Sequence, residues 1–223
     1  AKKLPLRIQR GVQRIESLVP AAERTRAITV KLEQADKVVA SQTVNLSPVR
    51  DWVIYVLPHS HVDIGYTAVQ SDVERRQMEH IDTALALSRK TAAYPPEARF
   101  KWNVEVLWAV DSYLRQASPD QQEAFFEAVR SGTIGLDAMY ANILTGLCRP
   151  EELLRMLDYA KRLEQRCGIP VESAMISDIP GYTWGTVSAM AHAGIKYWSI
   201  GPNLFDRIGT TLQEWQDKPF YWV

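Results

Sequence analysis

The 223-residue sequence has little cysteine, no net charge and no long apolar run. Two cysteines, Cys148 and Cys167, are too few for a disulfide framework and fit a reducing cytosol, so we expect a cytoplasmic protein. Basic and acidic side chains both number 26, which leaves no long-range field for nucleic acid or anionic lipid. No apolar run approaches the roughly 18 residues that span a bilayer, and the start lacks a signal-peptide core. We therefore expect neither nucleic acid nor a membrane as a partner.

The composition is that of a globular protein. Hydrophobic residues make up 46% and charged residues 23% of the chain, which is enough apolar material for a packed core. Seven tryptophans and nine tyrosines are many for this length. They indicate either core and interface packing or a surface on which sugars stack, and composition does not decide between the two.

The amino-terminal part differs from the rest of the chain. Its β-prone segments, in which apolar and polar side chains alternate or β-branched residues gather, are 4–12, 27–33 and 38–46. A linker over 47–51 follows, with Pro48 inside it. We predict a small β appendage with its linker over 1–50 and a larger domain over 51–223.

The larger domain alternates strand-like and helix-like segments. The predicted strands are 52–57, 100–107, 133–140, 173–178 and 195–200. The predicted helices are 69–91, a segment beginning at Ser118-Pro119, 149–166 and 183–193. Alternation of this kind predicts a parallel sheet covered by helices, either open or closed into a barrel.

The two ends of the sequence suggest a piece of a longer protein. The chain does not begin with methionine, and residues 218–223 look like the opening of a strand. We therefore expect further residues of any active site to lie in the remainder of the polypeptide. An unfinished barrel exposes strand edges and an apolar face, so we also expect association with that remainder or with a second copy.

The strongest chemical signal follows the first predicted strand. Ligands of parallel α/β proteins bind at the carboxyl ends of the strands, where His59, His61 and Asp63 stand at alternate positions. In extended backbone such residues share a face. Imidazole nitrogen with carboxylate oxygen suits Zn²⁺ and related divalent ions. The alternative is a histidine-rich turn with ordinary hydrogen bonds.

Five segments, in this order, resemble glycoside hydrolase family 38, the zinc-dependent α-mannosidases. Residues 57–66 (LPHSHVDIGY) are similar to the opening H-S-H-x-D-x-G-W motif of the family. The other similar segments are 102–114, with Glu105 in the place of an acidic family residue, 149–155, 178–181 and 193–197. The resemblance covers about residues 52–201.

This resemblance implies a fold and a set of roles. It implies an α/β fold in which the chain forms part of a seven-stranded (β/α) barrel with mostly parallel strands, preceded by the β appendage. It implies one zinc ion held by His61 and Asp63, and a carbohydrate substrate in contact with Tyr66 and His59. The family reaction is retaining hydrolysis of α-mannosides, with one carboxylate as nucleophile and a second carboxylic acid as proton donor.

One segment departs from the family pattern. The family nucleophile, also a zinc ligand, is expected within 140–145, which contains no carboxylate. Asn142 is the nearest polar residue and is a candidate metal ligand through its amide oxygen. Asp178 and Asp137 are the remaining candidate catalytic acids. Two other functions stay open: a metal-dependent carbohydrate deacetylase, which needs no such nucleophile, and an inactive carbohydrate-binding domain.

Overall fold

The computed structural model describes residues 3–7, 9–203, 216, 218–219 and 221. The chain divides into two compact units, Ala1–Tyr55 and Val56–Val223. The strand predicted to open at 218–223 lies largely outside the described residues. Among the described helices, none combines the length and the apolar composition needed to cross a membrane.

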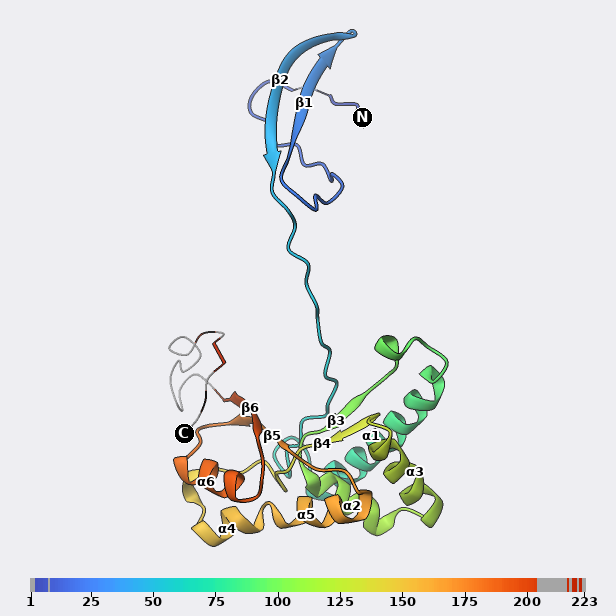
Figure 1. Cartoon of the computed structure of the whole chain (residues 1–223), viewed down its shortest axis with the longest axis vertical. Helices are drawn as coiled ribbons and strands as arrows, with labels where there is room; N and C mark the ends of the chain where they lie inside the picture. The colour runs from blue at the N-terminus through green and yellow to red at the C-terminus, as the bar shows by residue number, and fades with distance from the viewer. Residues whose placement is uncertain (1–2, 8, 204–215, 217, 220, 222–223) are drawn as a thin grey trace. The chain divides into compact units, whose positions relative to one another are not determined.

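The first unit contains a β-hairpin. Strand β1 (Arg26–Gln34) pairs antiparallel with β2 (Lys37–Leu46), which confirms the two strands predicted from the alternating pattern (Figure 1). Ala35 and Asp36 form the two-residue turn with φ of 48° and 61°. Positive φ at both positions matches the right-handed twist of the flanking strands. The predicted strand at 4–12 is wrong for its described residues, which adopt no regular structure.

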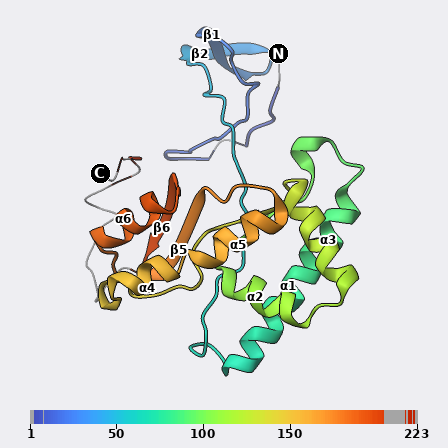
Figure 2. The same cartoon turned by 60° about the horizontal axis from the view of Figure 1, so that its bottom comes forward.

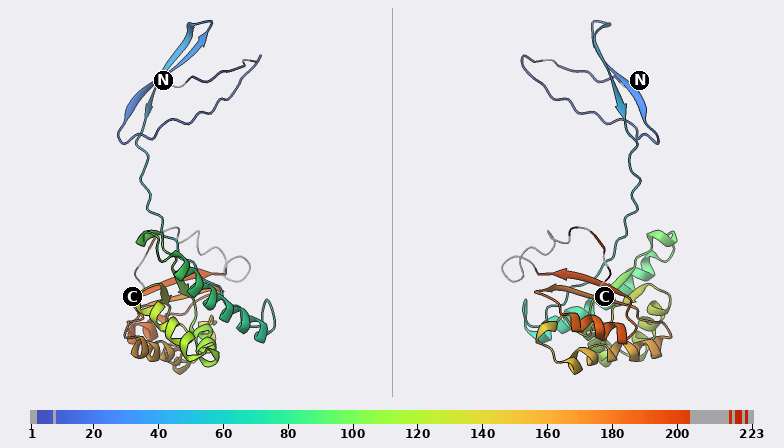
Figure 3. Two further views of the ribbon diagram at one scale, coloured as in Figure 1. Left: turned by 90° about the vertical axis from the view of Figure 1, so that its right-hand side faces the viewer. Right: turned by 60° about the vertical axis from the view of Figure 1, so that its left-hand side comes forward.

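The second unit alternates helices and short strands, as predicted. Its elements are α1 (Gln70–Thr91), η1 (Pro96–Ala98), β3 (Trp102–Val104), α2 (Leu107–Gln116), α3 (Pro119–Arg130), β4 (Ile134–Leu136), η2 (Thr145–Leu147), α4 (Pro150–Arg155), α5 (Asp158–Cys167), β5 (Ser173–Ile179), α6 (Trp184–His192) and β6 (Tyr197–Pro202). Helices α4, α5 and α6 lie on one side of the β5–β6 pair (Figures 1 and 3). Helices α1 and α3 pack together beside α2 (Figure 2).

The strands pair in parallel, in the order in which they follow one another. β3 pairs with β4 and β5 with β6, so the described part of this unit holds two small parallel sheets. A hydrogen bond of 2.9 Å from the Ala138 amide to the Ser173 carbonyl joins the end of β4 to the start of β5. Within each pair the two strands direct their carboxyl ends the same way, and ligands of parallel α/β proteins bind at such ends.

The predicted first strand at 52–57 is wrong. These described residues form no strand, and Trp52, Ile54 and Tyr55 are 69%, 80% and 90% exposed. Pairing begins only beyond them, where Asn103 donates to the Pro58 carbonyl at 2.9 Å and His59 forms a parallel bridge with Asn103. An apolar run forms a buried strand only where neighbouring strands and helices cover it, which is a tertiary property.

The predicted helix over 149–166 is two helices. α4 ends at Arg155 and α5 begins at Asp158. The carbonyl of Met156, at the break, accepts a hydrogen bond from the Tyr140 amide at 3.2 Å. This contact from outside the helix draws the carbonyl away from the helical pattern. Gly168 ends α5 in the left-handed conformation, with φ of 69°, which glycine adopts readily.

A single apolar core holds the helices against the strands. Helix α1 contributes one face, on which Val73, Ile81 and Leu85 are buried. Phe125 of α3 is fully buried beside Tyr113 of α2, at a ring separation of 6.0 Å. Ser118 caps α3 through a reciprocal pair of hydrogen bonds with Gln121, which confirms the predicted start of this helix.

Candidate metal centre and active site

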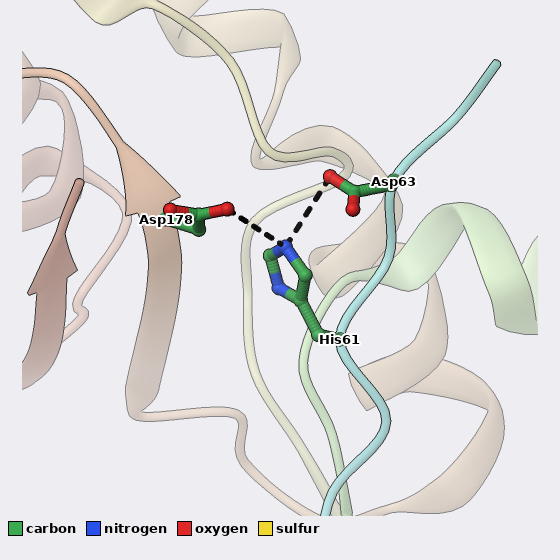
Figure 4. A group of neighbouring side chains, drawn as sticks. All are labelled: His61, Asp63 and Asp178. Carbon is green, nitrogen blue, oxygen red and sulfur yellow. Dashed lines mark ion pairs between the residues drawn. The ribbon is translucent and has the colours of Figure 1, made fainter. Parts of the chain in front are cut away.

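Three side chains with metal-binding atoms meet at the carboxyl ends of the strands. His61 and Asp63 follow the bridge at His59, and Asp178 comes from the end of β5 (Figure 4). Each offers one ligand atom, and these three atoms lie within 4.8 Å of one another. The Nε2 atom of His61 is 3.3 Å from Oδ1 of Asp63 and 3.9 Å from Oδ2 of Asp178.

These distances fit a divalent metal ion. Two ligands about 2.1 Å from a tetrahedral Zn²⁺ lie about 3.4 Å apart, and the separation of His61 from Asp63 is 3.3 Å. The Nε2 atom of His61 is buried and has no hydrogen-bond partner among the described residues. A buried ring nitrogen that faces two carboxylates in this way has the arrangement of a metal ligand.

A local irregularity of β5 places Asp178 in this group. The pairing of β5 with β6 shifts between Ser177 and Ile179, so Asp178 is an extra residue at a β-bulge. Its φ is 58°, a left-handed conformation that is uncommon for aspartate. Oδ1 of Asp178 accepts a hydrogen bond from Asn203, while Oδ2 faces His61. Bulges of this kind re-aim side chains near active sites.

A fourth residue, Glu105, lies behind His61. It follows β3 directly, and its side chain is 0% exposed. Nδ1 of His61 lies 2.9 Å from Oε1 and 3.2 Å from Oε2 of Glu105. Because a carboxylate accepts, this hydrogen bond assigns the ring proton to Nδ1 and leaves the lone pair on Nε2, toward Asp63 and Asp178. The sequence places Glu105 in a segment that resembles the family but gives it no role in the site; only the structure shows it beside His61.

The acidic surroundings set the electrostatics of the histidine. The hydrogen bond with Glu105 raises the pKa of His61 above its ordinary value, while burial acts in the opposite direction. The charges of Glu105, Asp63 and Asp178 raise the pKa of His61 further. A site that favours a proton on the ring also favours a metal cation, and the two compete for Nε2.

The structure also places His59 and Asn142 at Glu105. Nδ1 of His59 is 3.4 Å from Oε2 of Glu105. The amide nitrogen of Asn142 donates to Oε1 of Glu105 at 3.0 Å and to the Val62 carbonyl at 3.2 Å. Its Oδ1 is buried and has no hydrogen-bond partner in the described part of the chain, so this oxygen is available to a ligand.

Asp137 and Tyr66 lie outside the group of three. Asp137 is 3% exposed and accepts a hydrogen bond from Asn103, which passes over Gly135 to reach it. Burial raises the pKa of Asp137, although hydrogen bonds from Ser173 and Asn103 act against this shift. Tyr66, three residues after Asp63, is 81% exposed.

Parallel strands with a histidine and two carboxylates at their carboxyl ends define the class of the protein as an α/β domain with a candidate metal centre. Comparison with known families then gives the family. Residues 51–223 match the family described as "Glycosyl hydrolases family 38 N-terminal domain". The chain belongs to glycoside hydrolase family 38.

Two known proteins are similar to parts of the chain. The chain is 33% identical over 82 residues to "Alpha-mannosidase 2" of Arabidopsis thaliana, a match that covers 36% of this chain and 6% of the relative. The structure resembles that of an α-mannosidase from Enterococcus faecalis V583, with a TM-score of 0.56 and 22% identity. That likeness covers 66% of this chain and 16% of the other and concerns the fold. The chain thus spans a small part of the length of these relatives.

Proposed function

We propose that this chain forms part of the catalytic domain of an α-mannosidase-like glycoside hydrolase that uses one divalent metal ion. The observation that carries the proposal is the convergence of His61, Asp63 and Asp178 at the strand ends of a family 38 chain. Both similar proteins are α-mannosidases by name, which supports α-linked mannose as the substrate class.

His61 and Asp63 hold the ion, most simply Zn²⁺, and Asp178 is the third protein ligand. When bound, the ion supplies a Lewis acid for the hydroxyl oxygens of the sugar. Asn142 offers its free Oδ1 as a weaker ligand. The exposed ring of Tyr66 provides a surface on which the sugar stacks, and His59 lines the same edge.

Asp178 is the carboxylate that this site offers as nucleophile. A carboxylate oxygen of Asp178 attacks the anomeric carbon, and the glycosidic C–O bond breaks while the leaving oxygen takes a proton from a second carboxylic acid. Water then cleaves the glycosyl ester, which restores the carboxylate and gives net retention. We expect the second acid from another part of the natural protein, since Asp137 is buried and already bonded to Asn103.

The strand order supports a larger barrel. The segment at Pro58 and His59 forms backbone hydrogen bonds with β3, and β3 pairs with β4. The residues after β4 bond to the start of β5, and β5 pairs with β6. Neighbouring strands that follow the chain order in parallel are typical of a (β/α) barrel. We propose that 51–223 supplies this part of a seven-stranded barrel, with 1–50 as a separate β appendage.

The test uses the full-length natural protein and an activated aryl α-mannoside, together with a panel of other aryl glycosides. Asp178→Ala is expected to reduce kcat by at least about 1,000-fold, because it removes the nucleophile. Added azide is expected to restore turnover of this variant and to give a glycosyl azide of inverted configuration. Asp111→Asn, whose carboxylate accepts from Tyr140 at 2.8 Å, is the control outside the site.

Three results would contradict the proposal in different ways. If Asp137→Asn abolishes turnover and Asp178→Ala does not, then Asp137 is the nucleophile. If the protein releases acetate from acetylated sugars and hydrolyses no glycoside, it is a metal-dependent deacetylase. If it binds mannosides and turns over neither substrate class, it is a carbohydrate-binding domain.

A further inference from the structure

We propose that Glu105 is the positioning residue of the metal centre: it holds His61 in the tautomer and orientation that binds the ion. The inference rests on the proposed function, because it concerns the same centre. It gives a role to a residue that contacts neither Asp63 nor Asp178 through any hydrogen bond or ion pair among the described residues.

The geometry has the form of a carboxylate–histidine–metal relay. One ring nitrogen of His61 lies 2.9 Å from Glu105, and the other lies 3.3 Å from Asp63. Metal-binding histidines commonly donate their second ring N–H to a carboxylate, which fixes the tautomer and increases the basicity of the ligating nitrogen. Without this acceptor the proton is free to move to Nε2, which then has no lone pair for the ion.

Glu105 also joins the segments that carry the site. It contacts His59, which forms the bridge to Asn103, His61 two residues later, and Asn142 from the segment after β4. The side chain is 0% exposed, so water does not compete for these contacts. One buried carboxylate at the end of β3 thus fixes the positions of groups that lie far apart in the sequence.

The surroundings favour this role over simple stabilisation of the fold. A buried charge is weak evidence for stability, because desolvation of the carboxylate offsets the attraction of its partners. Within the described residues, the ion pairs of Glu105 are those with His59 and His61. Among the described residues, the carboxylate therefore pairs with the histidines of the site and with no lysine or arginine.

The test measures metal affinity in the full-length natural protein after removal of bound metal by a chelator. Zn²⁺ is titrated in competition with a chromophoric chelator, and Co²⁺ serves as a spectroscopic probe. Glu105→Ala is expected to weaken Zn²⁺ binding by about 10- to 100-fold and to change the visible absorption of bound Co²⁺. Glu105→Gln keeps an acceptor oxygen for His61, so its Zn²⁺ affinity is expected to lie between those of the wild type and Glu105→Ala.

Asp111→Asn is the control, since Asp111 is a partly buried carboxylate outside the site that accepts from the Tyr140 hydroxyl, and the Zn²⁺ affinity of this variant is expected to equal that of the wild type. Circular dichroism and melting in the presence of chelator measure folding apart from binding. If the alanine variant does not fold, the glutamine variant decides.

Three outcomes are adverse, and they differ in what they overturn. A wild-type protein that binds no metal overturns the proposed centre and this inference with it. A wild type that binds metal, with folded Glu105 variants of equal affinity and unchanged Co²⁺ spectrum, overturns the inference alone. A lower apo melting temperature without a change in affinity also overturns it, because that pattern is what a merely structural role predicts.

Discussion

Replacing Asp63 by asparagine tests whether the three-residue group is a metal centre. The substitution keeps the size of the side chain but removes the charge that faces Nε2 of His61 at 3.3 Å. An amide oxygen is a weaker ligand than a carboxylate for a divalent ion. We expect the variant to fold and to lose most of the stabilisation that added metal gives the wild type.

The magnitude follows from ligand count and linkage. Structural zinc sites with four ligands bind with about 10–16 kcal/mol, or about 3 kcal/mol for each ligand, so losing one weakens binding by about 100-fold. At a metal concentration of 100 times the wild-type Kd, binding stabilises the folded protein by about 2.7 kcal/mol. The same concentration equals the Kd of the variant, where the gain is only about 0.4 kcal/mol. The expected loss is about 2.3 kcal/mol.

The assay is denaturant unfolding of the full-length protein, with chelator and with excess Zn²⁺. Asp120→Asn is the control, because Asp120 stands in the first turn of α3, away from the site. It is expected to keep the full gain from metal, with a small loss of baseline stability. An equal gain in wild type and Asp63→Asn would refute the reasoning, and so would the absence of any gain in the wild type.

Three further predictions concern stability. Phe125→Ala is expected to lower the unfolding free energy by about 3–5 kcal/mol, because its ring is 0% exposed; a loss below 1 kcal/mol in urea unfolding would contradict this packing. Ser118→Ala removes the acceptor for the Gln121 amide, and thermal melts should show a loss of about 1 kcal/mol; an unchanged melt would argue against the cap. Burial raises the pKa of Asp137 in the folded protein, so protonation of this carboxyl stabilises the fold. This stabilisation is complete below the usual carboxyl pKa of about 4 and is lost as the pH rises through the raised pKa of the folded state. In Asp137→Asn, the free energy of unfolding in urea should depend less on pH over that range than in the wild type. An identical pH dependence in the variant and the wild type would contradict the raised pKa.

The amino-acid sequence predicted local structure correctly where the signals act between neighbouring residues. The capping pair Ser118 and Gln121 and the stop at Gly168 act through backbone groups within a few residues, so their effects are visible in the sequence. The β-prone segments at 27–33 and 38–46 likewise predicted the two strands, because strand-forming composition and a period of two are local properties, whereas the structure shows that they pair as a hairpin.

Strand lengths depended on partners that lie elsewhere. The apolar run at 52–57 has the composition of a buried strand, yet these residues are exposed, and pairing with β3 begins at Pro58 and His59. The break between α4 and α5 has the same kind of cause, since the Tyr140 amide bonds to the Met156 carbonyl. Neither contact can be predicted from the local sequence, because each partner lies in a distant part of the chain.

For the site, the sequence by itself indicated the family and the neighbouring pair His61 and Asp63, because alternate residues of an extended segment share one face. Only the tertiary structure decided which carboxylates join them. A bulge with left-handed backbone aims Asp178 at His61, and a fully buried Glu105 meets the other ring nitrogen. These contacts span tens of residues, and they form only when parallel strands bring their carboxyl ends to one edge.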